Sequence, residues 1–449
     1  MENSNTKARA HGFSGKIGFV MAAAGSAVGL GNLWRFPYLA AENGGGIFLL
    51  VYFILSVSLG FLMLITEIAI GRSTGKSAID AFRALDKRFS FLGYLATLSP
   101  LLVLPYYSVI GGWVMKYAFA FIVGDGDMTN DGYYTDFISR VEEPLLWFAI
   151  FVVITTFVVM LGVKRGIEGV SSVVMPILIL LILFIAIYGI VTIDGAVEGV
   201  LFYIRPDFSK FSVNTVISAL GQLFYSMTLA SGVMVTFGSY MKKDISIMSS
   251  AHQIELFDTG IAFLAGLMII PAVYAFTGGE IGYGPGLIFE ALPKIFNNIP
   301  FARLIGAAFF IMVFFAALTS AIALMETVVA AVMDKLKLRR SVACFSVMTV
   351  ILALGLLCSF GYSLWSDFRI IGLTVLEFFD FLSNNIIMPA LAVLTCVVVG
   401  YIVKPKTVTD ELNIGGKVRA VRLYSATIRY IAPLSILVIF VSSIAEVFG

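Results

Sequence analysis

The chain has 449 residues, of which 59% are hydrophobic and only 13% charged, and its formal net charge is +2. Soluble domains carry about 25% charged residues, so this composition predicts an all-α polytopic membrane protein. A net charge near zero offers no argument for nucleic-acid binding. The three cysteines lie in apolar runs and the two histidines are isolated, so neither a disulfide framework nor a cysteine–histidine metal site is expected.

A length of about 20 apolar residues per membrane crossing predicts eleven transmembrane helices. In chain order they cover approximately residues 15–38, 46–70, 91–123, 145–163, 170–192, 214–240, 255–277, 301–333, 341–361, 371–402 and 424–447. Lysine and arginine gather in the connections on one side, and acidic residues in those on the other. This asymmetry predicts a cytoplasmic N-terminus and an extracytoplasmic C-terminus for a multi-pass protein of the cell (inner or plasma) membrane. The polar N-terminal stretch does not have the features of a cleaved signal peptide, so the first span is expected to be retained.

The first predicted span contains the unusual stretch 25-GSAVGLGNLWRFP-37. Its glycines at positions 25, 29 and 31 each make a helix about 1 kcal/mol less favourable than alanine would. In lipid, a helix can lose its internal hydrogen bonds only where protein, ligand or an aqueous cavity replaces them. An unwound break is therefore predicted around residues 28–31, where free carbonyls and amides can bind an ion or an anionic group. A glycine-lined contact between helices is the alternative.

A second interruption is predicted in the sixth span at 226-SMTLASG-232, where hydroxyl residues and a glycine replace apolar residues. Interrupted helices at corresponding places in two halves of a chain indicate the midplane site of an inverted-repeat transporter. The two spans are five apart, an odd number, so the second half would have the opposite orientation in the membrane. The prediction is a single transporter domain, 1–449, with a 5+5 inverted repeat and broken helices 1 and 6. Residues 15–192 would form the first repeat, 214–402 the second, and 424–447 an additional eleventh helix.

Several motifs in a fixed order now point to a known family. They are GSAVGLGNLWRFPYLAAENGGGIF in the first two spans, EIAIGRSTG after the second, 221-GQLFYSMTLASG-232, 282-GYGPGLIFEALP-293 and 316-AALTSAIAL-324. From about residue 16 to residue 430 the chain resembles the neurotransmitter:sodium symporters, in particular the bacterial sodium-dependent amino-acid transporters with the leucine-transporter-like fold. Inverted repeats with broken helices are already known for this family. The resemblance implies symport of an amino acid into the cell with sodium, by alternating access.

The resemblance implies two sodium ions bound by oxygen atoms. The first would be held by the Ala27 carbonyl, the side chains of Asn32 and Ser226, and the carboxylate of the substrate. Asp258 occupies the matching position on the seventh span, where many relatives carry asparagine. An ionisable side chain inside a membrane is a functional candidate by default. Asp258 would either ligate sodium or supply the negative charge that chloride supplies in some relatives, so no chloride requirement is expected. A hydrogen-bonded, solvated aspartate near the cytoplasmic entry of the span is the alternative.

The second sodium site implied by the resemblance combines main-chain and hydroxyl oxygens. Carbonyls would come from Gly25, Val28 and Ala316, and hydroxyls from Thr319 and Ser320. Serine and threonine in a helix commonly bond to a preceding carbonyl, which is the alternative reading of the two neighbouring hydroxyls.

The resemblance also implies an amino-acid substrate, whose carboxylate would face the amides of Leu30 and Gly31 at the start of a half-helix. Gly29 stands where monoamine transporters of the family carry aspartate, which favours a ligand with its own carboxylate. Ser231 replaces the phenylalanine of the bacterial leucine transporter, which favours a bulky or aromatic hydrophobic side chain. The implied substrate-binding residues are Ala27, Leu30, Gly31, Val103, Tyr107, Ile110, Tyr225, Ser226, Thr228, Ser231, Ser320 and Leu324. Most of their side chains are apolar, as in other small-molecule sites.

Charged and aromatic residues on either side of the predicted site are interpreted as gates. On the outer side, opposite charges would close the passage beneath an aromatic lid, Tyr225, and a hairpin at 281–300 would plug it. Independently hydrated charges are the alternative. The spacing from Arg9 to Phe13 is one residue longer than in the family. The predicted contact of Arg9 with Asp334 is therefore in question. The outer gate would be formed by Arg35 and Asp380, and the resemblance implies an inner gate formed by Arg9, Ser239, Tyr240 and Asp334.

Two other kinds of function stay open at this point. A related fold could couple the amino acid to protons, with Asp258 as the proton carrier, and a channel or receptor would bind an amino acid without concentrating it. The sequence shows no nucleophile elbow, no phosphate-binding loop and no catalytic carboxylate pair beside a histidine, so an enzyme is not expected. The expected partners are an amino acid, sodium ions and the lipid bilayer, and no nucleic acid.

Overall fold

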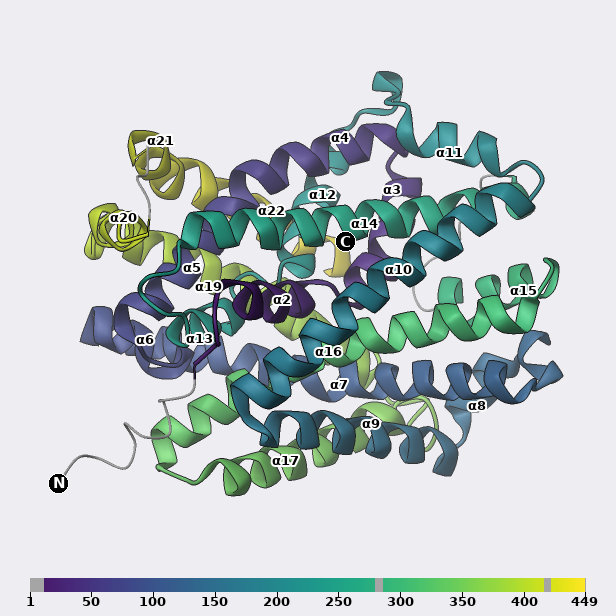
Figure 1. Cartoon of the computed structure of the whole chain (residues 1–449), viewed down its shortest axis with the longest axis horizontal. Coiled ribbons are helices and arrows are strands. Elements are labelled where there is room, and N and C mark those ends of the chain that lie inside the picture. Colours follow the sequence, from purple (N-terminus) through teal and green to yellow (C-terminus); the bar gives the residue numbers. More distant parts are fainter. Residues whose placement is uncertain (1–11, 279–285, 416–420, 449) are drawn as a thin grey trace.

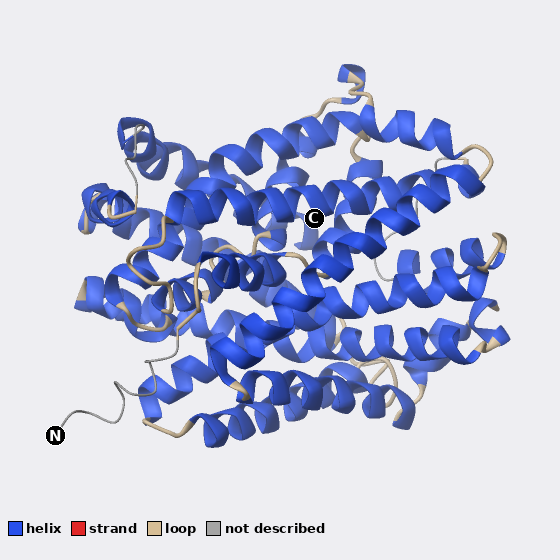
Figure 2. Ribbon diagram, viewed as in Figure 1, coloured by secondary structure: helices blue, strands red, loops and turns tan. Residues whose placement is uncertain are grey.

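The computed structural model describes residues 12–278, 286–415 and 421–448, and in these ranges all regular structure is helical apart from two isolated β-bridges. Most of the long helices run along the longest axis of the molecule (Figures 1 and 2). Nine helices in the described ranges are long and apolar enough to cross a membrane, and a pair bent by 54° makes a tenth. Adding the divided sixth span, every one of the eleven predicted regions contains helix. The predicted all-α membrane fold with broken helices 1 and 6 is confirmed.

The first half of the chain forms spans one to five. Their elements are α2 (Lys16–Ala27), η1 (Gly31–Arg35) and α3 (Phe36–Glu42); α4 (Gly46–Leu55), η2 (Ser56–Gly60) and α5 (Phe61–Thr74); α7 (Ser90–Val123); α9 (Glu142–Met160); and η5 (Val163–Glu168) with α10 (Gly169–Thr192). Shorter helices connect them: α6 (Ala78–Leu85), η3 (Lys87–Phe89), η4 (Gly126–Thr129), α8 (Tyr133–Ser139), α11 (Ala196–Ile204) and η6 (Phe208–Lys210).

The second half forms spans six to eleven. Their elements are α12 (Val213–Ser226) and α13 (Val233–Ser239); α14 (Ile247–Thr277); α16 (Ala302–Leu336); α17 (Arg340–Phe360); α18 (Val375–Asp380), η8 (Phe381–Ile387), α19 (Met388–Val397) and η9 (Val398–Ile402); and α21 (Val421–Ala426), η10 (Thr427–Ile431) and α22 (Ala432–Phe448). The connections contain η7 (Leu287–Ala291), α15 (Leu292–Asn297) and α20 (Pro405–Asn413). The division into repeats at 15–192 and 214–402 stays a prediction.

The helix ends follow ordinary capping chemistry. Ser212 and Thr374 each form a capping box, which satisfies amides at the starts of α12 and α18. Gly75 ends α5 in the left-handed conformation, with φ at +58°, which glycine adopts without a steric penalty. The break after α2 has a different cause, because Val28 is extended, with ψ at 100°, and the chain resumes as η1 only at Gly31.

The core lies between the two longest helices, α7 with 34 residues and α16 with 35, which pack against each other. Aromatic side chains of α7, α8 and η7 fill one end of this contact. Phe289 of η7 stacks on Tyr134 with ring centroids 5.2 Å apart and contacts Tyr117 of α7 at 5.1 Å. The described part of the predicted hairpin, from residue 286, is thus packed onto this end of the bundle, and residues 279–285 lie outside the described ranges.

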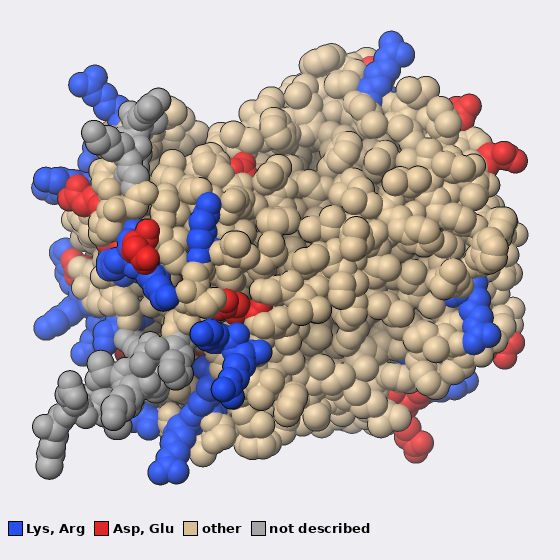
Figure 3. Space-filling model, viewed as in Figure 1, with Lys and Arg blue, Asp and Glu red and all other residues tan. Residues whose placement is uncertain are grey.

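Charged side chains avoid the middle of the molecule on the face seen in Figure 3. Lysine and arginine gather at the end that carries α6, α13 and α20, whereas α8, α11 and α15 lie at the opposite end (Figures 1 and 3). The uncharged belt between the ends agrees with a molecule that spans a lipid bilayer.

Candidate substrate and sodium site

A cavity lies where the breaks of the first and sixth spans face α7, α16 and the tenth span. Its lining residues are Ser26, Ala27, Gly29, Leu30, Gly31, Val103, Tyr107, Tyr225, Ser226, Thr228, Ser320, Leu324, Asn384 and Met388. Counting its open mouth, it holds about 420 Å³ of space that no protein atom fills. All the predicted substrate residues border it except Ile110, which is buried in α7, and Ser231, whose hydroxyl donates to the Thr228 carbonyl at 2.5 Å. Asn384 and Met388 belong to a span from which the sequence analysis predicted no substrate contact.

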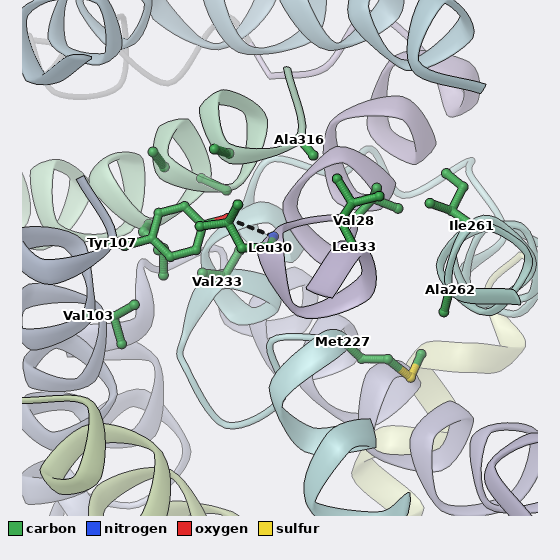
Figure 4. Packing of buried hydrophobic residues seen from close by; sticks show 14 of the residues in the cluster. Val28, Leu30, Leu33, Val103, Tyr107, Met227, Val233, Ile261, Ala262 and Ala316 are labelled. Carbon is green, nitrogen blue, oxygen red and sulfur yellow. Dashed lines mark hydrogen bonds between the residues drawn. The ribbon is translucent and has the colours of Figure 1, made fainter. Parts of the chain in front are cut away.

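The first break presents main-chain groups to this cavity. The Leu30 N–H donates to the Tyr107 hydroxyl at 3.2 Å, the contact drawn in Figure 4. A Cβ at Gly29 would lie 2.7 Å from Ser320 Oγ and 2.8 Å from the Tyr107 hydroxyl. A side chain at position 29 would therefore displace the Ser320 and Tyr107 hydroxyls, and both of these residues line the cavity.

Three of the predicted ligands of the first sodium ion meet in one buried group. Asp258 Oδ1 accepts hydrogen bonds from Asn32 Nδ2 at 2.8 Å and from Ser226 Oγ at 2.7 Å. Asn32 Oδ1 accepts the Gly29 N–H at 3.2 Å, and the Tyr52 hydroxyl donates to Asp258 Oδ2 at 3.4 Å. Asn32 and Asp258 have no exposed surface. Carboxylate, amide and hydroxyl oxygens together form the oxygen-rich environment that a hard cation prefers.

The second predicted sodium site also comes together, around a single hydroxyl. Ser320 Oγ lies 3.4 Å from the Gly25 carbonyl, 3.1 Å from that of Ser26 and 3.2 Å from that of Val28. One hydroxyl has one proton to donate, so it cannot satisfy three carbonyls at once. A cation among these oxygens would satisfy all of them, and the donor set therefore fits sodium. Thr319 Oγ1 contacts the Ala316 carbonyl at 3.1 Å.

The second break, between α12 and α13, is held by a residue that the sequence analysis did not single out. Thr228, Ala230 and Gly232 all have positive φ values, +49°, +57° and +75°. The Ala230 N–H donates to Glu67 Oε1 of α5 at 2.6 Å, and Glu67 is only 2% exposed. An acidic residue within an apolar span was the available signal. Gln222 Nε2 also donates to the Gly31 carbonyl at 2.9 Å, which ties the sixth span to the first.

A second cavity, which we call the vestibule, lies next to the first. Its lining residues are Arg35, Gly221, Phe224, Tyr225, Asn384, Asn385, Met388, Pro389, Ile436 and Ile439. The Arg35 guanidinium lies over the Tyr225 ring, 4.8 Å from its centroid, and makes no ion pair within 4.0 Å of Asp380, although both residues are described. Asp380 Oδ1 instead accepts from Asn384 Nδ2 at 2.7 Å.

The predicted inner-gate residues lie at the end of the molecule that carries α13. The Tyr240 hydroxyl donates to Glu326 Oε1 at 2.8 Å, and Glu326 is paired with Arg340. Asp334 Oδ2 accepts from the Ser77 hydroxyl at 2.5 Å. Sequence reasoning missed these partners, although Glu326 is a carboxylate within an apolar run. The hydroxyl of Ser239, another predicted inner-gate residue, donates to the Thr236 carbonyl at 2.6 Å. Arg9, the last of the predicted inner-gate residues, lies outside the described residues.

Two interrupted helices around a cavity lined by main-chain groups define a secondary transporter. The chain matches the sequence profile of the Sodium:neurotransmitter symporter family over residues 10–125 and 135–448, and it belongs to that family. The predicted family is confirmed, and the chain is a multi-pass membrane transporter of a sodium-dependent family.

Three relatives illustrate how far the similarity extends. The chain is 36% identical to an uncharacterized sodium-dependent transporter, YhdH, of Bacillus subtilis (strain 168), over 96% of this chain and 97% of that protein. It is 32% identical to an uncharacterized sodium-dependent transporter of Haemophilus influenzae, over 96% of this chain and 98% of that protein. The crystal structure of MhsT in complex with L-phenylalanine superposes with a TM-score of 0.88, at 34% identity, over 96% of this chain and 99% of that chain.

Proposed function

We propose that this transporter carries a hydrophobic, bulky or aromatic L-amino acid into the cell together with two sodium ions. The observation that carries this proposal is the cavity in which the Leu30 amide and the Tyr107 hydroxyl lie together, beside the group formed by Asn32, Ser226 and Asp258. A ligand with a carboxylate would accept from Leu30, Gly31 and Tyr107 and would bring a negative charge to the first sodium ion.

The side-chain part of the cavity supports an apolar substrate. Val103, Leu324 and Met388 supply apolar surface, and Thr228 supplies a hydroxyl. The structurally similar MhsT was crystallised with L-phenylalanine. An aromatic amino acid is therefore the first candidate to test.

Sodium would act by stabilising the two breaks. The first ion would join Ala27 and Asn32 of the first span to Ser226 and Asp258, and the second would join α2 to α16 through Gly25, Val28, Ala316, Thr319 and Ser320. Ion binding would then favour the conformation in which the outer side is closed, and coupling requires such a change in populations. Spans one and six would move against a scaffold formed by spans three, four, eight and nine.

The Asp258 carboxylate is proposed to supply the fixed negative charge next to the first ion, so that chloride is not required.

The N-terminus is proposed to be cytoplasmic and the C-terminus extracytoplasmic, because lysine and arginine concentrate at the end of the molecule that carries α6 and α20. In this orientation the vestibule and the Arg35–Asp380 region lie on the outer side, and Ser239, Tyr240, Asp334 and Arg9 on the inner side.

Uptake of labelled L-phenylalanine into proteoliposomes, with and without an inward sodium gradient, tests the proposal. We expect uptake above equilibrium only with the gradient, and competition by tyrosine, tryptophan and leucine. Uptake driven by a pH gradient without sodium would support proton coupling instead, and binding without uptake would support a receptor. Preference for glycine or alanine would overturn the proposed substrate class.

A further inference from the structure

Three residues border both the substrate cavity and the vestibule: Tyr225, Asn384 and Met388. Residues that line two neighbouring cavities form the partition between them. Any substrate that passes from the vestibule into the cavity must displace part of this partition. Asn384 is its only side chain with an amide.

The Asn384 amide joins two spans. Its Nδ2 donates to Asp380 Oδ1 at 2.7 Å, one turn earlier in the tenth span, and to the Tyr106 hydroxyl of α7 at 3.0 Å. An asparagine amide has two hydrogens, so these two bonds use both of them. The bond to a carboxylate is charge-assisted and is stronger than one between neutral groups.

The local backbone turns Asn384 towards both cavities. It lies in η8 (Phe381–Ile387), a π-helical segment in which the Met388 N–H bonds to the Ser383 carbonyl five residues earlier. Segments of this kind occur frequently at functional sites. Asn384 and Met388, four residues apart, share one helix face and complete the partition together.

Arg35 takes no direct part in this contact. Its guanidinium lies over the Tyr225 ring and makes no ion pair with Asp380 within 4.0 Å, although both side chains are described. Closure by a direct pair between Arg35 and Asp380 is therefore not what this conformation shows.

We propose that Asn384 is the positioning residue of the outer gate, and that its amide holds the partition closed by tying Asp380 to Tyr106. This inference rests on the proposed transport function and adds to it a residue on which gating depends. Replacing the amide with a carboxylate removes both donors and places a second negative charge beside Asp380. The gate should then stay open even when sodium and substrate are bound.

The test uses a thiol probe in the vestibule. The three native cysteines are buried and free and are replaced by serine, and Gly221→Cys supplies the probe, because a Cβ there meets no atom within 4 Å. In proteoliposomes of the parent protein, sodium with L-phenylalanine should slow labelling by a membrane-impermeant maleimide. In Asn384→Asp the labelling should stay about tenfold or more faster than in the parent, the effect of losing a hydrogen bond to a charged group. The KM for phenylalanine should also rise more than the maximal rate falls.

Asn385→Asp is the matched control, because Asn385 borders the vestibule but not the substrate cavity. It places the same charge at the vestibule without removing a bond to Asp380 or Tyr106, so it should label and transport within about twofold of the parent. The reversed pair Asp380→Asn with Asn384→Asp restores one amide and one carboxylate and should recover part of the closure. A purely structural loss would not be recovered in this way.

If Asn384→Asp does not fold, Asn384→Ala is used in the test instead. The alanine variant removes the same two hydrogen bonds without adding a charge. Parent-like labelling and KM in the variant tested would overturn the role of Asn384. The absence of sodium-dependent amino-acid uptake by the parent protein would instead overturn the proposed function. In that case the labelling rates measured with sodium alone would still report on the gate.

Discussion

The two helix breaks at the centre of this transporter are built in different ways. The break after α2 spans residues 28–30 and is surrounded by side chains that meet its own amides and carbonyls, those of Tyr107, Asn32 and Ser320. The break between α12 and α13 is longer, residues 227–232, and contains two non-glycine residues with positive φ, Thr228 and Ala230. A carboxylate from a different span, Glu67, holds it.

This difference separates two tasks. The first break places its main-chain groups at the proposed sodium and substrate sites, so changes there should act on affinity. The second break maintains a strained path for the chain, and Glu67 and Ala230, which hold it, do not border the cavity, so changes at these two residues should act on folding and on conformational change. The following substitutions test this division, from the largest expected effect to the smallest.

Glu67→Ala should have the largest effect. It leaves the buried Ala230 N–H without its acceptor, which costs about 1–3 kcal/mol, and creates a cavity as well. We expect a lower unfolding temperature in detergent and a drop in uptake of about 10- to 100-fold. Glu67→Gln retains an acceptor oxygen and is the control. If the glutamine and alanine variants behave alike, the contact does not hold the break.

Gly29→Ala should weaken substrate binding without unfolding the protein. The added Cβ would lie 2.7 Å from Ser320 Oγ and 2.8 Å from the Tyr107 hydroxyl. Overpacking costs about 1–3 kcal/mol, so the apparent affinity for L-phenylalanine should fall about 5- to 140-fold. Gly221→Ala, where the Cβ meets open space, should leave it unchanged. Equal affinities in the two variants would contradict the assignment of this cavity.

Asp258→Asn should raise the half-saturating sodium concentration for uptake, because a neutral amide is a weaker sodium ligand than a carboxylate. We expect an increase of about tenfold, which corresponds to roughly 1.4 kcal/mol of binding free energy. Added chloride should recover part of the loss if the carboxylate supplies the local negative charge. Glu255→Gln is the matched control, since Glu255 lies on the same helix, one turn away, and contacts Ser56. Unchanged sodium dependence in Asp258→Asn would refute its role.

Ala230→Gly should have the smallest effect, and a stabilising one. A non-glycine residue at φ +57° carries a conformational penalty of about 1–2 kcal/mol. Glycine removes this penalty, but it loses more conformational entropy on folding than alanine does, which offsets part of the gain. We expect a small rise in the unfolding temperature in detergent. Gly232→Ala should act in the opposite direction, because its φ is +75° and the new Cβ would lie 2.6 Å from the Ala96 carbonyl oxygen. A lower unfolding temperature for Ala230→Gly would show that the second break is not strained.

Much of the architecture could be predicted from the sequence. The eleven spans follow from apolar length, because a polar backbone in lipid must satisfy its hydrogen bonds within a helix. The break at residues 28–31 could be predicted because glycines, Asn32 and Arg35 occur where lipid favours an uninterrupted apolar helix. The residues of the sodium and substrate sites were implied by the resemblance to the family, and the structure brings most of the substrate residues together around one cavity.

The tertiary structure decided which of these side chains meet. Ile110 follows Tyr107 by three residues, which at 100° per residue places it about 60° around the helix, and it does not border the cavity. The contacts of Glu67 with Ala230 and of Asn384 with Tyr106 join residues 163 and 278 positions apart. Apolar length and local motifs carry no information on such pairs, because they depend on how the helices are rotated and packed against one another. The sequence by itself therefore determined the spans, the breaks and the class of transporter, and the packing of the spans decided which side chains hold the breaks and form the gate.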